Sequence, residues 1–200
     1  MDAVMASARR RGMPRAAFLL MVDAESQCLF LSDRGGVRHI YAVSTSARGL
    51  GEKNGSLQTP RGWHRVAKRH GHDLPTGAHL VARRFTGTVF SPRQWRRGTG
   101  DAILSRVLRL EGLEPGRNKG GQVDSFRRMI YLHGTNHEEH VGVNASSHGC
   151  IRMNNRDIVD LFSRVRGRAV WVWIGHLTAS QPRVAAGNRR PPAKPSAKRR

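Results

Sequence analysis

Two short stretches of the sequence decide how the rest of the chain is interpreted. They read Tyr131-Leu132-His133-Gly134-Thr135-Asn136 and Ser146-Ser147-His148-Gly149-Cys150-Ile151-Arg152-Met153. A cysteine attacks as its thiolate, so it needs an imidazole nearby to take the proton and a positive environment to hold the charge. His133, at the end of an apolar run, and His148, two residues before Cys150, can supply both. We therefore interpret Cys150 as a candidate nucleophile.

The residues around Cys150 favour chemistry over a structural role. Gly149 allows a tight turn and close approach of a substrate, and backbone N–H groups beside Cys150 could form an oxyanion hole. Arg152 could hold a substrate carboxylate with two parallel hydrogen bonds. An isolated cysteine is more often a small core residue, and that is the prediction for Cys28, which lies in an apolar run.

The run from Ser147 to Met153 resembles the signature of the L,D-transpeptidase catalytic domain (YkuD type), with His133 as the histidine upstream of it. Tyr41 to Ser46 resembles an early strand of that family, and residues 58–62 resemble its Thr-Pro-x-Gly turn. The resemblance covers roughly Ala17 to Ile174. It implies a mainly β fold, sandwich-like or barrel-like, with one helix after the cysteine.

The resemblance also implies roles for the motif residues. Cys150 is the nucleophile, and His133 donates and accepts the proton while its other nitrogen is held by the Gly134 carbonyl. His148 helps to shape the oxyanion site and to stabilise the thiolate. The remaining residues are expected to shape the oxyanion site or to orient a loop or the substrate: Gly134, Ser147, Gly149 and Arg152. Asn144 stands where relatives often have proline, so the lid geometry is expected to differ.

The activity implied by the resemblance is peptidoglycan L,D-transpeptidation. Cys150 would attack the bond between the stem-peptide diamino acid and D-Ala, form a thioester and pass the acyl group to an amine in a 3→3 cross-link. Water as the acceptor would make the chain an L,D-carboxypeptidase, and a protein lysine would make it a protein-anchoring enzyme. No cofactor and no metal are expected. A wall-binding module with a decayed site is the alternative, which the full Cys, His and Gly set disfavours.

Hydrophobic periodicity predicts the elements outside the motif. We expect strands at Phe18–Val22, Cys28–Leu31, Val37–Ser44, His79–Phe90, Ile103–Leu110, Phe126–Leu132 and Val170–Ile174. One amphipathic helix is predicted from Asn155 to Val165, capped by Asn154 or Asn155. Trp171 and Trp173 alternate onto one face and are expected in the core. Residues 45–62, rich in glycine, are predicted to be a long loop.

Composition divides the chain into three parts. We expect a basic flexible arm at residues 1–15, a catalytic domain at 16–176, and a disordered, basic, proline-rich tail at 181–200. Lys and Arg number 35 against 14 acidic residues, giving a net charge of +21. Such charge predicts an anionic partner, and contact of the tail with wall or membrane polymers fits better than nucleic acid, for which no motif is present.

The predicted location follows from the substrate. An enzyme of peptidoglycan would work in the cell envelope or periplasm. Arg9, Arg10, Arg11 and Arg15, followed by the apolar run Ala16–Val22, resemble the start of a secretory signal. The run is short and acidic residues follow it, so a strand is the preferred interpretation and a cytoplasmic location remains the alternative.

The histidines suggest a metal site as a second hypothesis. His133, His137 and His140 have ligand-like spacing, and His148 follows them. The pattern His-Glu-Glu-His differs from the helical zinc-hydrolase motif, so we expect His137 and His140 to be solvated loop residues. His64, His70, His72 and His79 are expected to form a solvated, substrate-facing rim.

Overall fold

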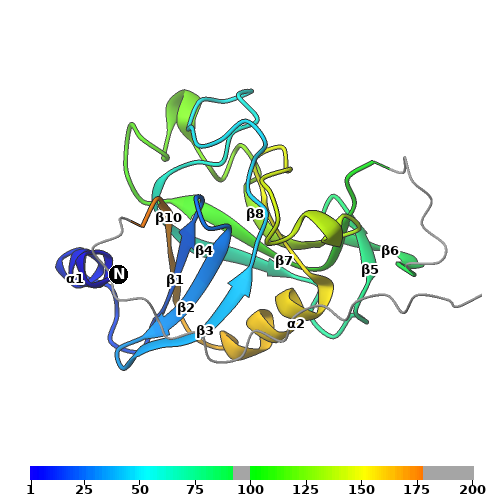
Figure 1. The fold of residues 1–200 in the computed structure, drawn as a ribbon, viewed down its shortest axis with the longest axis horizontal. Helices are drawn as coiled ribbons and strands as arrows, with labels where there is room; N and C mark the ends of the chain where they lie inside the picture. Colours follow the sequence, from blue (N-terminus) through cyan, green and yellow to red (C-terminus); the bar gives the residue numbers. More distant parts are fainter. Residues whose placement is uncertain (92–99, 178–200) are drawn as a thin grey trace, which may run out of the picture.

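The structure of the 200-residue chain is a computed structural model that describes residues 1–91 and 100–177. In this part the chain is mainly β and forms one ten-stranded sheet, as expected from the sequence (Figure 1). The strands are β1 (Phe18–Asp23), β2 (Cys28–Asp33), β3 (Gly36–Ala42), β4 (Gly62–His70), β5 (Ala78–Val81), β6 (Arg84–Val89), β7 (Ile103–Gly112), β8 (Tyr131–Thr135), β9 (Ile151–Met153) and β10 (Val170–Gly175).

The strand order is β3-β2-β1-β10-β4-β7-β5-β6, with β8 paired to β7 and β9 paired to β8. The β1–β10 and β8–β9 pairs are parallel, and the other pairs are antiparallel. The apolar run at residues 16–22 thus becomes the buried strand β1, as the preferred interpretation predicted. Parallel pairing of β8 with β9 matters most for function, because these strands carry the two motifs.

The main core lies between the sheet and helix α2 (Asn155–Arg164). Alternate residues of β1 and β10 point into this core together with Leu132, Ile151 and Met153 from β8 and β9. Helix α2 contributes the predicted apolar face with Ile158, Leu161 and Phe162, and Val165, directly after its last residue, joins them. It begins after Asn154, and Asp157 in its first turn and Arg164 in its last turn complement the helix dipole. The motif strands are therefore held against a packed helix.

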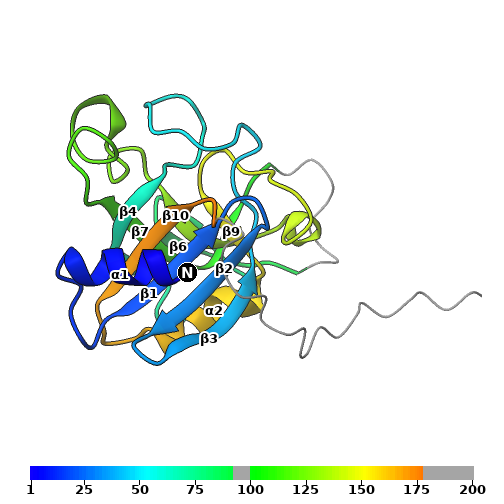
Figure 2. The ribbon, with the colours of Figure 1, turned by 60° about the vertical axis from the view of Figure 1, so that its left-hand side comes forward.

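The N-terminal segment departs from the predicted flexible arm, because residues 2–10 form helix α1 (Asp2–Arg10). Figure 2 shows α1 lying across the face of the sheet formed by β1 and β10. Met1, Val4, Met5 and Ala8 follow the spacing i, i+3, i+4 and i+7 and pack in a second cluster with Leu19, Met21, Trp63, Trp171 and Trp173. Trp171 and Trp173, predicted as core residues, are half-buried and pack against this second cluster rather than in the main core.

Two further sequence predictions are corrected by the sheet. Strand β4 was not expected, and it places His64 fully buried rather than on a solvated rim. His64 Nε2 lies 3.0 Å from Ser125 Oγ and Nδ1 lies 3.0 Å from Gly62 O. The strand predicted at Phe126–Leu132 begins only at Tyr131, because residues 125–130 form a turn in which the Ser125 carbonyl accepts from Ile130 N.

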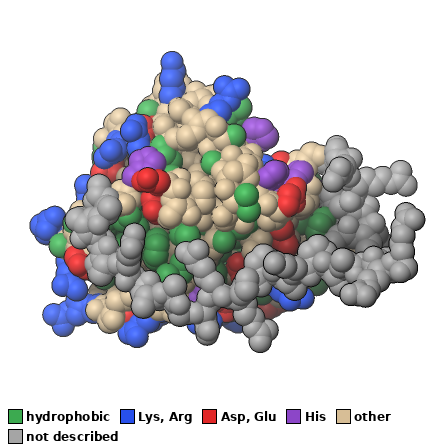
Figure 3. Space-filling model, viewed as in Figure 1, with side chains coloured by type: hydrophobic (Ala, Val, Ile, Leu, Met, Phe, Trp, Pro, Cys, Tyr) green, Lys and Arg blue, Asp and Glu red, His purple; other side chains and the backbone are tan. Residues whose placement is uncertain are grey.

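Two regions of the sequence lie outside the described residues. These are 92–99 and 178–200, so the tail prediction for residues 181–200 is not addressed by the structure. Within the described part, no helix combines the length and apolar character needed to cross a bilayer. On the face drawn in Figure 3, Lys and Arg side chains stand around the outline rather than in one patch.

Candidate active site

The two motifs meet through the parallel pairing of β8 with β9. In this register Leu132 faces Ile151 and His133 faces Arg152. Cys150 precedes Ile151 and therefore lies level with Tyr131. Continued through Cys150, which lies one residue before β9, the alternation of side chains along a strand puts Cys150 and His133 on the same face, two residues apart in register. The structure thus brings the two motifs together on adjacent strands.

The sulfur of Cys150 contacts the backbone of the turn that precedes β8. Its Sγ lies 3.5 Å from the carbonyl oxygen of Met129, to which the thiol donates. Met129 has a φ of +55°, a left-handed conformation that non-glycine residues adopt mainly in turns and at functional sites. Burial raises the pKa of the Cys150 thiol to about 11, against the lowering effects of the Tyr131 backbone N–H and of Arg152 and Arg128. The resting site therefore holds a thiol whose proton must be removed.

His133 is buried and has a defined tautomer. Its Nδ1 lies 2.8 Å from the carbonyl oxygen of Gly134, which can only accept, so Nδ1 carries the proton and Nε2 carries the free lone pair. Burial also lowers the pKa of His133, so the ring is neutral near pH 7. A neutral ring with a free Nε2 is the form that can accept a proton. The bond to Gly134 agrees with what the family resemblance implied.

Gly134 has a packing reason to be glycine. A Cβ at this position would lie 2.7 Å from the carbonyl oxygen of Leu104 on β7 and still closer to Asn155 Oδ1. Such contacts are shorter than real Cβ atoms tolerate, so β8 can approach β7 and α2 only without a side chain here. Gly134 therefore positions His133 through its carbonyl and through this close approach.

The turn before Cys150 is fixed by two hydroxyl groups. Ser147 Oγ donates to the Cys150 carbonyl at 2.5 Å and accepts from Gly149 N at 3.2 Å. Thr59 Oγ1 donates to the Gly149 carbonyl at 3.1 Å. Gly149 has a φ of +121°, which is strained for any residue with a side chain. Ser147, Gly149 and Thr59 thus set the direction of the Cys150 side chain.

Arg152 is directed at the protein rather than at an open cleft. It is 3% exposed, and its Nη2 forms an ion pair with Asp101. Its Nη1 donates to Ser146 Oγ at 2.9 Å and to Ser146 O at 3.2 Å. Of the two roles expected for Arg152, this geometry fits orientation of the loop. His148 Nδ1 lies 3.9 Å from Asp101, and its side chain is largely exposed.

Arg128 is a second cation near the thiol, and sequence reasoning did not single it out. Its Nη1 donates to Glu52 O at 2.8 Å and to Gly51 O at 3.2 Å, and its Nη2 donates to Gln58 O at 2.6 Å. This half-buried side chain ties the long loop at residues 45–62 to the nucleophile, and it favours the charged form of Cys150. No local signal marks it, since its partners lie about 70 residues away in sequence.

The structure separates the histidines that the metal hypothesis grouped. His133 lies buried in β8, whereas His137 precedes the short 3₁₀ helix η2 (Glu138–His140), His140 ends it, and both are partly exposed. His148 points toward Asp101. The four side chains therefore do not form one metal site. Cys28 lies in strand β2, as predicted, but it is half-buried and belongs to neither core cluster, so the prediction of a core residue is not borne out.

Comparison with known protein families places the chain in one of them. The L,D-transpeptidase catalytic domain (YkuD) family matches residues 17–176 of the chain, and the chain therefore belongs to this family. No curated protein matches the sequence at a significant level.

Solved structures of L,D-transpeptidases align with the chain at low identity. One from Mycobacterium smegmatis shares 15% identity with a TM-score of 0.45, covering 80% of this chain and 59% of its own. One from Xylanimonas cellulosilytica shares 17% identity with a TM-score of 0.45, covering 86% and 69%. L,D-transpeptidase 3 from Mycobacterium tuberculosis, with a faropenem-derived adduct, shares 15% identity with a TM-score of 0.46, covering 78% and 60%. The chain thus spans about three fifths of the first of these proteins.

Proposed function

We propose that the chain transfers peptidoglycan stem-peptide acyl groups through a thioester on Cys150. The observation that supports this best is the β8–β9 pair, which projects Cys150 and His133 from one face while the Gly134 carbonyl fixes the His133 tautomer. Membership of the L,D-transpeptidase catalytic domain family indicates that the reaction is an acyl transfer. No metal takes part in the proposed chemistry.

In the first step the Cys150 sulfur attacks the carbonyl of the diamino acid at stem position three. His133 Nε2 takes the thiol proton as the S–C bond forms, because a thiol with a pKa of about 11 is not ionised beforehand. The C–N bond to D-Ala then breaks, and the proton passes from His133 to the leaving amine. Backbone N–H groups of the turn at Gly149 and Cys150 are the proposed donors to the oxyanion.

In the second step an amine of another stem attacks the thioester, and His133 takes its proton while the thiol is restored. The product is a 3→3 cross-link. Attack by water at the same carbonyl gives L,D-carboxypeptidase activity, and attack by a protein lysine anchors that protein to the wall. These outcomes differ only in the acceptor.

The proposed substrate places the reaction in the cell envelope. We further propose that the basic residues of 181–200 add electrostatic attraction to anionic wall or membrane polymers. A chain ending at Gln181 should keep its rate on a small soluble muropeptide but bind intact sacculi more weakly at low salt. Unchanged sacculus binding across a salt series would contradict a role for the tail.

The catalytic proposal is tested with a purified tetrapeptide muropeptide and mass spectrometry of protein and products. Wild type should show a thioester on Cys150 and release D-Ala with formation of a cross-linked dimer or a tripeptide. Cys150→Ala should be inactive, while Cys28→Ala serves as the matched control and should keep the wild-type rate. Product formation by Cys150→Ala at the wild-type rate would place the nucleophile elsewhere.

A further inference from the structure

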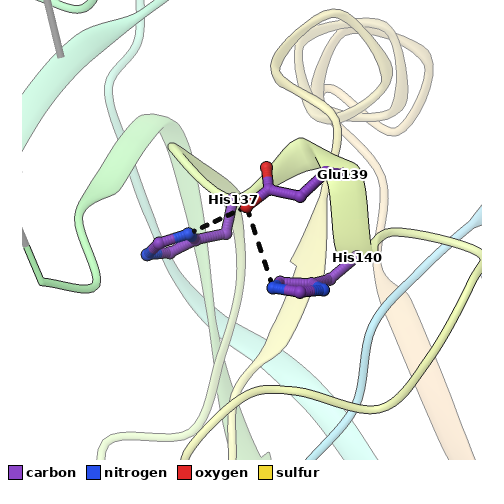
Figure 4. A group of neighbouring side chains, drawn as sticks. All are labelled: His137, Glu139 and His140. Carbon is purple, nitrogen blue, oxygen red and sulfur yellow. Dashed lines mark hydrogen bonds and ion pairs between the residues drawn. The ribbon is translucent and has the colours of Figure 1, made fainter. Parts of the chain in front are cut away.

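Three side chains outside the proposed catalytic pair converge on one point. His137, Glu139 and His140 lie at η2, directly after β8 (Figure 4). His137 Nδ1 lies 3.2 Å from Glu139 Oε1, and His140 Nε2 lies 3.7 Å from the same oxygen. One ligand atom from each of the three residues lies within 4.8 Å of the other two.

The opposite ring nitrogens of both histidines face acceptor oxygens. His137 Nε2 lies 3.1 Å from the carbonyl oxygen of Gly100, and His140 Nδ1 lies 3.1 Å from Asn144 Oδ1. A proton on each of these nitrogens would donate to the facing oxygen and leave a lone pair on the nitrogen that faces Glu139. Asn136 Nδ2 lies 3.5 Å from His137 Nε2 and donates to Gly100 O at 2.9 Å, so the Gly100 carbonyl is shared by both side chains.

In these tautomers each imidazole directs a lone pair toward the Glu139 carboxylate. Two imidazole nitrogens and a carboxylate oxygen gathered around one point can bind a cation there. A ring nitrogen that faces a common point while its partner nitrogen is held by a carbonyl is the usual arrangement of a metal-binding histidine. The arrangement around His137 and His140 meets this description twice.

The separations fit a transition metal. A tetrahedral zinc ion with bonds of about 2.0–2.1 Å holds its ligand atoms about 3.3 Å apart. The two measured separations, 3.2 and 3.7 Å, lie on either side of that value. Two imidazole nitrogens and one carboxylate oxygen form a ligand set typical of Zn²⁺, with a fourth position open to water.

We propose that His137, Glu139 and His140 bind a divalent transition-metal ion of the Zn²⁺ class. The ion would hold η2 against the segment that begins at Gly100. The Glu138 carboxylate anchors η2 from its other side, since it accepts from Asn155 N at 2.6 Å and from Asn155 Nδ2 at 2.8 Å. The next residue after Gly100 is Asp101, which pairs with Arg152 in the nucleophile loop. The site is therefore structural, and it does not depend on the proposed acyl transfer.

The test is titration of the full chain with Zn²⁺ alone by calorimetry at pH 7.5, in a Cys150→Ala background so that the thiol cannot bind the ion. We expect one equivalent to bind, and a His137→Ala, His140→Ala double variant to lose at least about ten-fold in affinity. His72→Ala is the matched control, because His72 is an exposed histidine paired with Asp73 outside the site. It should bind as the background does.

Two further measurements separate metal binding from loss of fold. The metal-free double variant should melt at the temperature of the background, while Zn²⁺ should raise the melting temperature of the background only. Co²⁺ should give the visible absorption of a tetrahedral site in the background and lose it in the double variant. Absence of a one-to-one Zn²⁺ isotherm in the background, or equal affinity in the double variant, would overturn the proposal.

Discussion

Replacing Asp101 by Asn tests whether an acidic residue outside the motif controls both stability and thiol ionisation. Asp101 is the carboxylate partner of Arg152, which is 3% exposed. Removing one partner of a fully buried pair costs about 3–5 kcal/mol. Asp101 is partly open to water, asparagine still accepts a hydrogen bond, and Arg152 keeps Ser146, so we expect about 1–3 kcal/mol. For a domain of this size that lowers Tm by about 2–12 °C.

The same substitution should change the titration of Cys150 in a defined direction. The negative charge of Asp101 raises the pKa of the Cys150 thiol, so its removal should lower that pKa below about 11. A lower pKa means more thiolate at a given pH below it. We would measure iodoacetamide alkylation of Cys150 across a pH series, locating the label by peptide mass because Cys28 is also a free thiol. The midpoint of the profile, rather than one rate, reports the pKa.

Asp33→Asn is the matched control for this experiment. Asp33 forms an ion pair with Arg38 at 2.8 Å, but the Arg38 side chain is 53% exposed, so the pair should contribute little. We expect a change in stability below about 1 kcal/mol and an unchanged Cys150 profile. If Asp101→Asn were as stable as wild type, or moved the alkylation midpoint upward, the assignment of Asp101 to the Arg152 loop and to the thiol environment would be wrong.

Four other substitutions or treatments give outcomes that follow from the structure. Gly134→Ala should destabilise the fold by about 3 kcal/mol or more, seen as a lower Tm, because its Cβ meets the Leu104 carbonyl. Burial lowers the pKa of His64 to about 4, so wild type should lose stability as pH falls from about 6.5 toward 4, and His64→Gln should flatten that slope in urea unfolding. Arg128→Met should raise the pKa of Cys150 and slow acylation by about ten-fold, whereas Arg127→Met, an exposed neighbour, should not. Carbapenems should add the mass of one drug molecule to wild type, and no adduct should form on Cys150→Ala.

Local pattern was sufficient for the elements whose side chains pack close to their own neighbours in sequence. The apolar runs that become β1 and β10, and the spacing of Ile158, Leu161 and Phe162 in α2, were predicted because burial imposes periods of two and 3.6 on such elements. The mainly β fold followed from their number. The same reasoning missed α1. The basic residues at its end suggest a solvated segment, whereas the apolar spacing of Met1, Val4 and Met5 is what packs against the sheet.

Strand β4 was missed for a different physical reason. Its sequence carries His64, Arg65, Lys68, Arg69 and His70, which suggests a solvated segment. The strand forms because β10 and β7 pair with its two edges, and backbone hydrogen bonds of this kind do not depend on side-chain polarity. His64 is then buried by tertiary packing, and its ring is satisfied by Ser125 far away in sequence.

The residues of the candidate active site also differ in whether the sequence could predict them. The groups proposed to react, Cys150 and His133, lie in short motifs that a single sequence reveals, because adjacent parallel strands bring two motifs together by backbone pairing alone. The groups that set their charge do not: Asp101 reaches Arg152 across 51 positions, and Arg128 reaches Gln58 across 70. Ion pairs and charge-assisted hydrogen bonds depend on the distance between two groups in space, so the spacing of residues in the sequence does not predict them. The motif therefore predicts the kind of reaction, whereas the readiness of the thiol to ionise is a property of the folded chain and would change with substitutions far outside it.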